Sequence, residues 1–409
     1  MTPFEKALGL ILENTSPLGR ITLPLSELSG KYLAEDIRTP FPLPRFDNSA
    51  MDGYAVRVAD FRDASSTHPI ALRIDGTIRA GESPVMSIKP GGAVKIMTGA
   101  PIPPEAEAVV IREDVESAEG LYCIRPVEPG ANIRRRGEEL PEGAVVLRAG
   151  TRVIPPVIGM LATLGLTSAV VHMPPRISVI VTGDELLQPG SDATESRIFD
   201  SNGPALLAAI KSLGICEVSL SNCPDNETTL KDMLSHSLRD SDIVITVGGI
   251  SVGDYDLVRR VNESLSIREI FWRVAIKPGK PTYFGVTNSD SHRRVSVFGL
   301  PGNPVAALVT FELFVKTVIG KMMGRQSPEP SLETAVLGRT LSKKHERLEF
   351  LRGRYDRRDD REIVLPVSRQ ESHMLSGLVS ADCLIMFPAG EHELTSGSEV
   401  KIINLNWDC

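Results

Sequence analysis

Residues 174–320 constrain the fold most, because short apolar strands alternate there with amphipathic helices. Residues 177–181 (ISVIV) and 243–247 (IVITV) are runs of β-branched residues, typical of buried strands. Apolar residues at helical spacing predict three helices, near residues 206–213, 230–238 and 305–318. Further strands are expected at residues 270–276 and 295–298. Strands and helices that alternate in this way predict a mostly parallel, doubly wound sheet.

Three glycine-containing turns follow predicted strands, at residues 180–186, 246–256 and 298–304. Ligands of such sheets bind at the carboxyl ends of the strands. Exposed backbone N–H groups in these turns, together with helix N-termini, can hold phosphate. A glycine in one such turn often marks only a tight turn, but three at one end of a sheet predict a phosphate-binding edge.

Acidic side chains accompany these loops: Asp184, Glu185, Asp225, Asp254 and Asp256. Each of them alone could cap a helix or face solvent. Beside bound phosphate they predict a Mg²⁺ site, since magnesium binds through one or two carboxylates plus substrate phosphates. Ser201 and Asn202 precede a predicted helix, where capping and ligand contact both remain open.

A cationic turn is predicted at residues 277–280 (KPGK), with Arg273 upstream. Pro278 and Gly279 bring Lys277 and Lys280 close together. Like charges in this arrangement are costly unless an anion compensates them. The turn is therefore interpreted as an anion site, with a solvated pair of lysines as the alternative.

The remaining chain predicts several smaller units. A helix is expected at residues 4–12, an extended proline-rich stretch at 38–45 and a small β-rich domain at 47–142, while residues 145–171 return to pack against the first segment. Polar β structure is expected after Pro328. The 34 glycines and 30 prolines agree with many turns.

Composition excludes several classes of function. A net charge of −7 gives the chain no general attraction for nucleic acid or anionic lipid, and no apolar run is long enough to span a membrane. Five scattered cysteines favour a reducing cytoplasm over a disulfide framework or a zinc site. No Ser/His/Asp or Cys/His order is readable, which disfavours nucleophilic catalysis.

Seven sequence blocks are similar to those of the molybdopterin molybdenumtransferase family, which is bacterial MoeA-like and related to the E domain of gephyrin. The blocks, which cover essentially the whole chain in order, are DNSAMDGYA (47–55), MTGAP (97–101), NIRRRGE (132–138), TGDEL (182–186), GGISVG (248–253), KPGKP (277–281) and LPGNP (300–304). The resemblance implies a multidomain α/β plus β protein.

Four domains are implied by the resemblance. They are a discontinuous elongated domain (1–45 and 143–173), an inserted β domain (46–142), an α/β molybdopterin-binding domain (174–322) and a C-terminal β barrel (323–409). It also implies a cytoplasmic homodimer, whose active site lies between the α/β domain of one subunit and the N-terminal β domain of the other. The implied reaction converts adenylated molybdopterin and molybdate, with Mg²⁺, into molybdenum cofactor and AMP.

The resemblance assigns site residues at matching positions. The expected catalytic residues are Asp52, Thr98, Glu139, Glu185, Asp225 and Asp256, of which Asp256 and Glu185 would hold Mg²⁺. The expected substrate-binding residues are Ser201, Gly248, Gly249, Ser251, Gly253, Arg273, Lys277, Lys280, Pro301, Gly302, Pro304, Arg352 and Ser372. Three positions depart from the family pattern: Glu139 replaces a common Asp, Arg273 an expected Lys, and Glu371 a small residue.

Catalysis by positioning and electrostatics is expected, because the substrates are anions and no nucleophile is apparent. Lys277, Lys280 and Arg352 would hold molybdate, while loop N–H groups and Mg²⁺ on Asp256 would hold the pyrophosphate. A molybdopterin adenylyltransferase-like enzyme, a gephyrin-like scaffold protein and a tungstate-using paralogue remain alternatives. A molybdopterin adenylyltransferase and downstream molybdoenzyme chaperones are possible partners.

Overall fold

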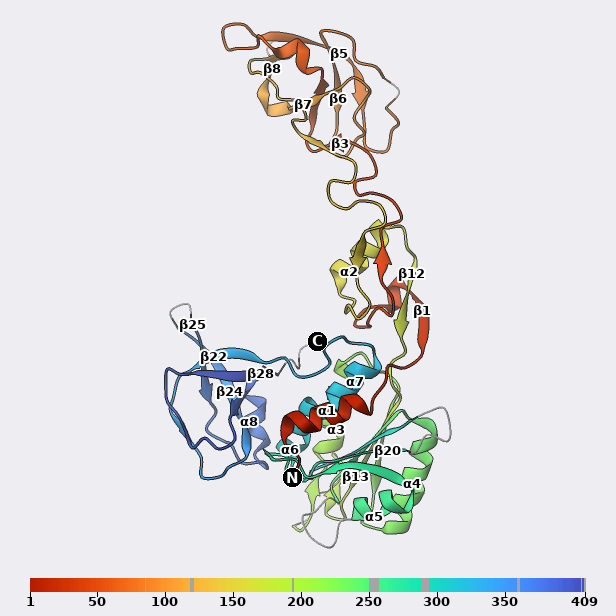
Figure 1. Cartoon of the computed structure of the whole chain (residues 1–409), viewed down its shortest axis with the longest axis vertical. Coiled ribbons are helices and arrows are strands. Elements are labelled where there is room, and N and C mark those ends of the chain that lie inside the picture. The colour runs from red at the N-terminus through yellow and green to blue at the C-terminus, as the bar shows by residue number, and fades with distance from the viewer. Residues whose placement is uncertain are drawn as a thin grey trace. The chain divides into compact units, whose positions relative to one another are not determined.

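The computed structural model describes residues 1–84, 86–117, 121–192, 195–249, 257–287, 294–358, 361–405 and 407 (Figure 1). The chain forms two compact units. Unit 1 consists of Met1–Glu35, Ala149–Ala162 and Leu166–Cys409, and unit 2 of Asp36–Arg148 and Thr163–Gly165. The finer division into four domains stays a prediction.

The central sheet of unit 1 has six strands in the order β16-β13-β17-β21-β20-β18. Their bounds are β13 (Ile177–Thr182), β16 (Val218–Cys223), β17 (Ile243–Val247), β18 (Ile267–Trp272), β20 (Tyr283–Thr287) and β21 (Ser296–Leu300). Strands β16, β13, β17 and β21 are parallel, whereas β20 runs antiparallel to both β21 and β18. The prediction of a mostly parallel sheet is confirmed.

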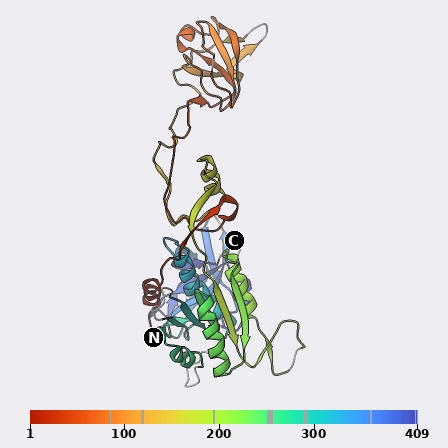
Figure 2. The ribbon, with the colours of Figure 1, turned by 90° about the vertical axis from the view of Figure 1, so that its right-hand side faces the viewer.

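Helices pack on both faces of this sheet (Figure 2). One face is covered by α1 (Phe4–Glu13), α3 (Asn202–Ser212), α6 (Pro304–Thr310) and α7 (Lys316–Met322), and the other by α4 (Glu227–Asp240) and α5 (Leu257–Ser264). Successive residues of β13 point to opposite faces of the sheet. Val179 and Val181 belong to the core under α1, α3, α6 and α7, whereas Ile180 belongs to the core under α4 and α5. The sheet is therefore doubly wound, as predicted.

Two predicted elements differ in detail from the structure. The predicted helix 305–318 is continued by α7 to Met322, with a π-helical stretch at Phe311–Val315 between α6 and α7. The predicted strand 270–276 is wrong, because β18 ends at Trp272 and Arg273 has φ 81°. The short strand β19 (Ile276–Lys277) follows and pairs with the C-terminal sheet instead.

The C-terminal region forms a closed five-stranded β barrel, confirming the predicted fold class. Its strands pair in a ring: β24 (Leu348–Arg358), β25 (Arg361–Pro366), β22 (Glu333–Leu337), β28 (Glu399–Asn404) and β26 (Cys383–Phe387), which returns to β24. Leu337, Val364 and Ile385 are fully buried inside it. Short elements lie beside the ring: β23 (Leu341–Ser342), β27 (Glu393–Leu394) and α8 (Leu375–Val379).

The expected return of residues 145–171 to the first segment is seen in one strand pair of unit 1. Strand β1 (Arg20–Pro24) pairs antiparallel with β12 (Ser168–His172), so Leu23 lies opposite Ala169. Smaller elements are η1 (Leu25–Glu27), α2 (Pro155–Thr163), β14 (Leu186–Leu187) and β15 (Ile198–Phe199). Within the ranges given above, no helix combines the length and apolar character needed to cross a membrane.

Unit 2 is β-rich, as the turn pattern predicts. Its main sheet has the order β7-β4-β6-β5-β9-β8. The bounds are β4 (Gly53–Val56), β5 (Ile70–Ile78), β6 (Gly92–Ile96), β7 (Ala108–Ile111), β8 (Val115–Ser117) and β9 (Leu121–Cys123). Unit 2 also contains two small strand pairs: β3 (Asn48–Ser49) pairs with β10 (Ile133–Arg134), and β2 (Ile37–Arg38) pairs with β11 (Val145–Leu147). Its short helical turns are η2 (Val58–Phe61) and η3 (Arg112–Asp114).

Candidate functional site

A cavity of about 570 Å³ lies at the carboxyl ends of β13, β17 and β21. The three glycine turns expected from the sequence meet there. The lining residues named in the sequence prediction are Glu185, Ser201, Asp225, Gly248, Gly249, Pro301, Gly302 and Pro304. The parallel order of β13, β17 and β21 explains this meeting, because parallel neighbours end at the same edge.

Gly248 shows why one of these turns needs glycine. Its φ is 85°, and a Cβ built on it would lie 2.4 Å from the carbonyl oxygen of Thr182. A larger residue would be strained and would push the β17 turn away from the β13 turn. The close approach of these two backbones therefore shapes the cavity.

Acidic residues lie beside the β13 turn. Thr182 Oγ1 donates a hydrogen bond of 2.6 Å to Asp225 Oδ1, and the Asp225 N–H donates to Asp184 Oδ1 at 3.1 Å. Glu185 and Asp225 both line the cavity. The predicted site residues Ser251, Gly253 and Asp256, together with Asp254, lie outside the described residues.

A magnesium ion with substrate phosphates needs only one or two protein carboxylates. Among residues of the described ranges, no group of three or more His, Cys, Asp or Glu side chains is placed to hold a metal by itself. Glu185 and Asp225 on the cavity wall are compatible with a magnesium ion that is held mainly by substrate. The donor set therefore fits magnesium better than a metal that is held by protein ligands alone.

The start of α3 corrects the expectation that Ser201 or Asn202 caps this helix. The capping bond comes from Asp200, whose Oδ1 accepts from the Gly203 N–H at 3.0 Å, and Ser201 makes no side-chain cap. Asn202 Nδ2 instead donates to the carbonyl oxygen of Gly302 at 2.7 Å. Asn202 thus ties α3 to the β21 turn, while Ser201 remains on the cavity wall.

A second cavity, of about 240 Å³, contains the lysine turn. Lys277 and Lys280 line it together with Ser372, and Pro281, Pro301 and Asn303 belong to the walls of both cavities. The two cavities are therefore neighbours with a common wall. Asn303 Nδ2 donates to Ser372 Oγ at 2.8 Å and so joins this wall to the C-terminal region.

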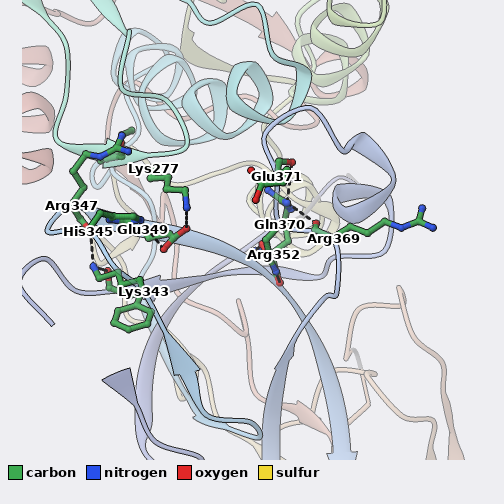
Figure 3. A network of polar contacts seen from close by, with 11 residues as sticks. Lys277, Lys343, His345, Arg347, Glu349, Arg352, Arg369, Gln370 and Glu371 are labelled. Atoms are coloured by element: carbon green, nitrogen blue, oxygen red, sulfur yellow. Dashed lines mark hydrogen bonds and ion pairs between the residues drawn. The ribbon is translucent and has the colours of Figure 1, made fainter. Parts of the chain in front are cut away.

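The compensating anion for Lys277 is a residue of the protein itself. Lys277 Nζ lies 2.9 Å from Glu349 Oε1, and His345 Nε2 lies 3.2 Å from Glu349 Oε2 (Figure 3). Arg347 Nη1 donates to the carbonyl oxygen of Ile276 at 2.8 Å. Glu349 therefore supplies part of the compensating charge that the sequence predicts for the paired lysines, and the anion site itself stays a prediction.

Arg352 is fully buried on the barrel side of the second cavity. Its Nη2 donates to the carbonyl oxygens of Arg369 (2.6 Å) and Glu371 (3.3 Å) (Figure 3), while Nε and Nη1 have no hydrogen-bond partner among the described residues. Burial lowers the pKa of Arg352, and the charges of Glu371 and Glu349 oppose this effect. Glu371 itself lines the second cavity, as do Gln370 and Ser372.

Arg273 is placed by an aromatic contact rather than by the lysine turn. Its guanidinium lies over the ring of Trp272, 3.8 Å from the ring centroid. It is not on the described wall of either cavity. The structure therefore does not bring Arg273 to the anion site that Lys277 and Lys280 line.

In unit 2, the structure brings together Asp52 and Thr98. Asp52 Oδ1 accepts from the Thr98 N–H at 2.7 Å and from Thr98 Oγ1 at 2.8 Å. These two bonds are the main reason that the pKa of Asp52 is lowered. Glu139 is exposed in the same unit, and its neighbour Glu138 accepts from the Arg135 N–H at 2.6 Å.

Sequence reasoning missed several residues of these cavities. His373 lines the larger cavity, and Arg347 and Glu349 line the smaller one. Glu349 directly precedes the block FLRGR that carries Arg352, but its approach to Lys277 depends on the pairing of β19 with β24. No local pattern predicts that pairing.

The chain thus combines an α/β domain that has two adjoining cavities, one walled by glycine turns and one by the lysine turn, with a C-terminal β barrel. Three family models match the chain in order. The MoeA N-terminal region (domain I and II) matches residues 2–165, the probable molybdopterin binding domain residues 178–321, and the MoeA C-terminal region (domain IV) residues 334–405.

Two relatives that align over nearly the whole chain are named molybdopterin molybdenumtransferases. The chain is 36% identical to the molybdopterin molybdenumtransferase of Haemophilus influenzae, covering 99% of each chain, and 35% identical to molybdopterin molybdenumtransferase 2 of Mycobacterium tuberculosis, covering 95% of each. The molybdopterin biosynthesis moeA protein of Pyrococcus horikoshii has a similar structure, with a TM-score of 0.85 at 31% identity, covering 99% of this chain and 100% of that one. The chain belongs to the MoeA, or molybdopterin molybdenumtransferase, family, as its sequence blocks predict.

Proposed function

We propose that the protein inserts molybdate into adenylated molybdopterin, which releases AMP and yields molybdenum cofactor. The observation that carries this proposal is the common wall of the two cavities. The larger cavity suits a ligand with phosphates, and the smaller one suits a compact oxyanion. Neighbouring sites of this kind can hold two substrates in a fixed relative position, which lowers the entropic cost of bringing them together.

The larger cavity would bind the pyrophosphate link of adenylated molybdopterin. Backbone N–H groups of Gly248, Gly249 and Gly302 and the N-terminus of α3 offer donors and a positive partial charge. Ser201 adds a hydroxyl on the wall, and Pro301 with Pro304 keeps the third turn rigid. These groups orient the phosphoanhydride without contributing a nucleophile.

The smaller cavity would bind molybdate through Lys277, Lys280 and the hydroxyl of Ser372. Arg352 lies buried behind residues 369–371 and adds positive charge to this side of the cavity. The Nε and Nη1 groups of Arg352 have no hydrogen-bond partner among the described residues. Burying them in this state is costly, so a nearby anion would stabilise them. Glu371 on the wall opposes this effect, because its carboxylate repels an anion in the cavity.

Magnesium, when bound with substrate, would withdraw charge from the phosphate that leaves as AMP. Glu185 would hold it from the described wall of the cavity. Asp256 is the second proposed ligand by sequence resemblance, with Asp225 as a nearby catalytic carboxylate. Asp52, Thr98 and Glu139 of unit 2 are assigned to the active site on the same basis.

We further propose a homodimer, in which unit 2 of one subunit completes the site of the other. The bond pair between Asp52 and Thr98 gives unit 2 an ordered, ionised carboxylate for that role. The thiols Cys123, Cys216, Cys223 and Cys383 are free, which suits a reducing cytoplasm. A molybdopterin adenylyltransferase and molybdoenzyme chaperones are the expected partners before and after this step.

The adenylyltransferase alternative is less well supported, because the full-length relatives named above share the N-terminal and C-terminal regions as well. The purified protein with adenylated molybdopterin, Mg²⁺ and molybdate should release AMP in amounts equal to the molybdenum cofactor formed. AMP release that does not depend on molybdate, or adenylation of free molybdopterin from ATP, would overturn the proposal. Replacing molybdate by tungstate tests the choice of oxyanion.

A further inference from the structure

Glu349 is a buried carboxylate whose two oxygens face different side chains, Lys277 and His345. It is 6% exposed; Oε1 lies 2.9 Å from Lys277 Nζ, and Oε2 lies 3.2 Å from His345 Nε2. Figure 3 shows the side chains of Lys277, His345 and Glu349 close together, with a dashed line between Lys277 and Glu349. The parallel pairing of β19 with β24 makes Lys277 and Glu349 register partners, so the fold itself places this ion pair.

The other cations near Glu349 are held by backbone oxygens. Lys343 Nζ donates to the carbonyl oxygens of Arg347, Phe387 and Pro388. Arg347 Nη1 donates to the carbonyl oxygen of Ile276. In the described part of the chain, Lys277 and His345 are thus the two side chains with a nitrogen close to a Glu349 carboxylate oxygen, at 2.9 and 3.2 Å.

Four charged groups from different segments act on His345. They are Glu349 of β24, Lys277 of β19, Arg347 just before β24 and Lys343 just after β23. Burial lowers the pKa of His345, Glu349 raises it, and the three cations lower it further. While Lys277 remains on Glu349, His345 is therefore largely neutral at neutral pH.

An oxyanion in the smaller cavity changes this balance. Lys277 lines that cavity, so its ammonium would be shared with the bound dianion or drawn away from Glu349. Either change makes the surroundings of His345 more negative, which favours the protonated imidazole. A ligand that favours one protonation state binds more tightly where that state is populated.

We propose that Glu349 and His345 position Lys277 through a proton-coupled counter-ion exchange: when the oxyanion engages Lys277, His345 takes up a proton from solvent and replaces the ammonium beside Glu349. This inference rests on the proposed molybdate site. Glu349 and His345 are positioning residues, because they act on molybdate through Lys277. Molybdate affinity should increase as the pH falls, by up to about tenfold per pH unit in the range where His345 titrates.

Calorimetry measures this exchange directly. Sodium molybdate is titrated into the full chain at pH 6.5, the ordinary pKa of histidine, in two buffers with different enthalpies of ionisation. The difference in heat gives the number of protons taken up, which should be positive at this pH, at most one per site, and vanish near about pH 8.5. Wild-type binding of molybdate without proton uptake would overturn the inference, whereas absence of any molybdate binding would overturn the proposed anion site instead.

His345→Gln should bind molybdate without proton uptake and with an affinity that no longer depends on pH. The matched control is His236→Gln, which removes an exposed histidine on α4 that lies 3.6 Å from Asp240; it should retain the wild-type uptake. Both variants are compared by melting curve with the wild type. If His345→Gln fails to fold, Glu349→Gln replaces it and should also lose the uptake, because the imidazolium then lacks its carboxylate. Wild-type uptake in either folded variant contradicts the exchange.

Discussion

Removing the Lys277 ammonium should weaken both the fold and the anion site, and the two effects can be separated. Lys277→Met keeps much of the side-chain volume but leaves Glu349 without the cation at 2.9 Å. The Glu349 side chain is only 8% exposed, whereas that of Lys277 is 39% exposed. The carboxylate therefore bears most of the cost of the missing charge.

The magnitude follows from this unequal burial. Breaking a fully buried ion pair costs about 3–5 kcal/mol. Lys277 is more than one-third exposed, and His345 at 3.2 Å can become protonated in its place, so we expect a loss of about 1–3 kcal/mol in the free energy of unfolding. The loss should be greater at pH 8 than at pH 6, because the charged imidazole compensates Glu349 only at the lower pH.

The double variant Lys277→Met/Glu349→Gln tests the assignment. It removes both charges, so the free energy of unfolding should return close to the wild-type value while molybdate affinity stays about 10–100-fold lower, the effect of one lost charge-assisted contact. Lys280→Met is the matched control: Lys280 lines the same cavity but forms no ion pair among the described residues, so affinity should fall without loss of stability. Urea unfolding followed by circular dichroism and molybdate titration measure the two quantities. A single variant as stable as wild type, or a double variant that regains molybdate binding, would refute the reasoning.

Three further predictions concern other parts of the site. Thr98→Val removes one of two hydrogen bonds to Asp52, so the pKa of Asp52 should rise toward the ordinary value of 3.8, as measured by NMR titration; an unchanged pKa would contradict the assigned cause. Gly279→Ala should distort the lysine turn, because the φ angle of Gly279 is 105° and the new Cβ would lie 2.4 Å from Thr310 Cγ2. If AMP release by this variant depends on molybdate as in the wild type, the turn does not need glycine at this position. The Asp52→Ala and Asp256→Ala proteins should each be inactive. When they are refolded together, about a quarter of wild-type activity should return, because each heterodimer has one intact site. If heterodimers form without any recovery of activity, the site lies within one subunit.

Much of the α/β fold could be predicted from the sequence. Strands β13 and β17 consist almost entirely of β-branched residues, with Ser178 as the exception, and such runs indicate strands buried on both faces. Strand β16 (VSLSNC) was missed because its polar residues give no clear apolar run. Strand β20 (YFGVT) was missed because Gly285 interrupts its short apolar run, and its antiparallel direction is set by the neighbouring strands.

Part of the candidate site could likewise be predicted from the sequence, and part could not. The glycine turns and the lysine turn could be recognised because each is a short segment whose backbone geometry depends on its own residues, such as Gly248 and Gly279. Their meeting at one edge followed from the predicted parallel strands. The capping role of Asp200 in place of Ser201 could not be decided, because neighbouring polar residues compete for the same N–H groups.

The sequence by itself determined the strand–helix alternation, the loops at the strand ends and the family. Only the tertiary structure decided which charges meet. Lys277 faces Glu349 because β19 leaves the α/β sheet and pairs with β24 of the barrel, and Arg352 is buried because residues 369–371 cover it. Local propensity acts over a few residues, whereas ion pairing and burial depend on segments far apart in the chain that packing brings together.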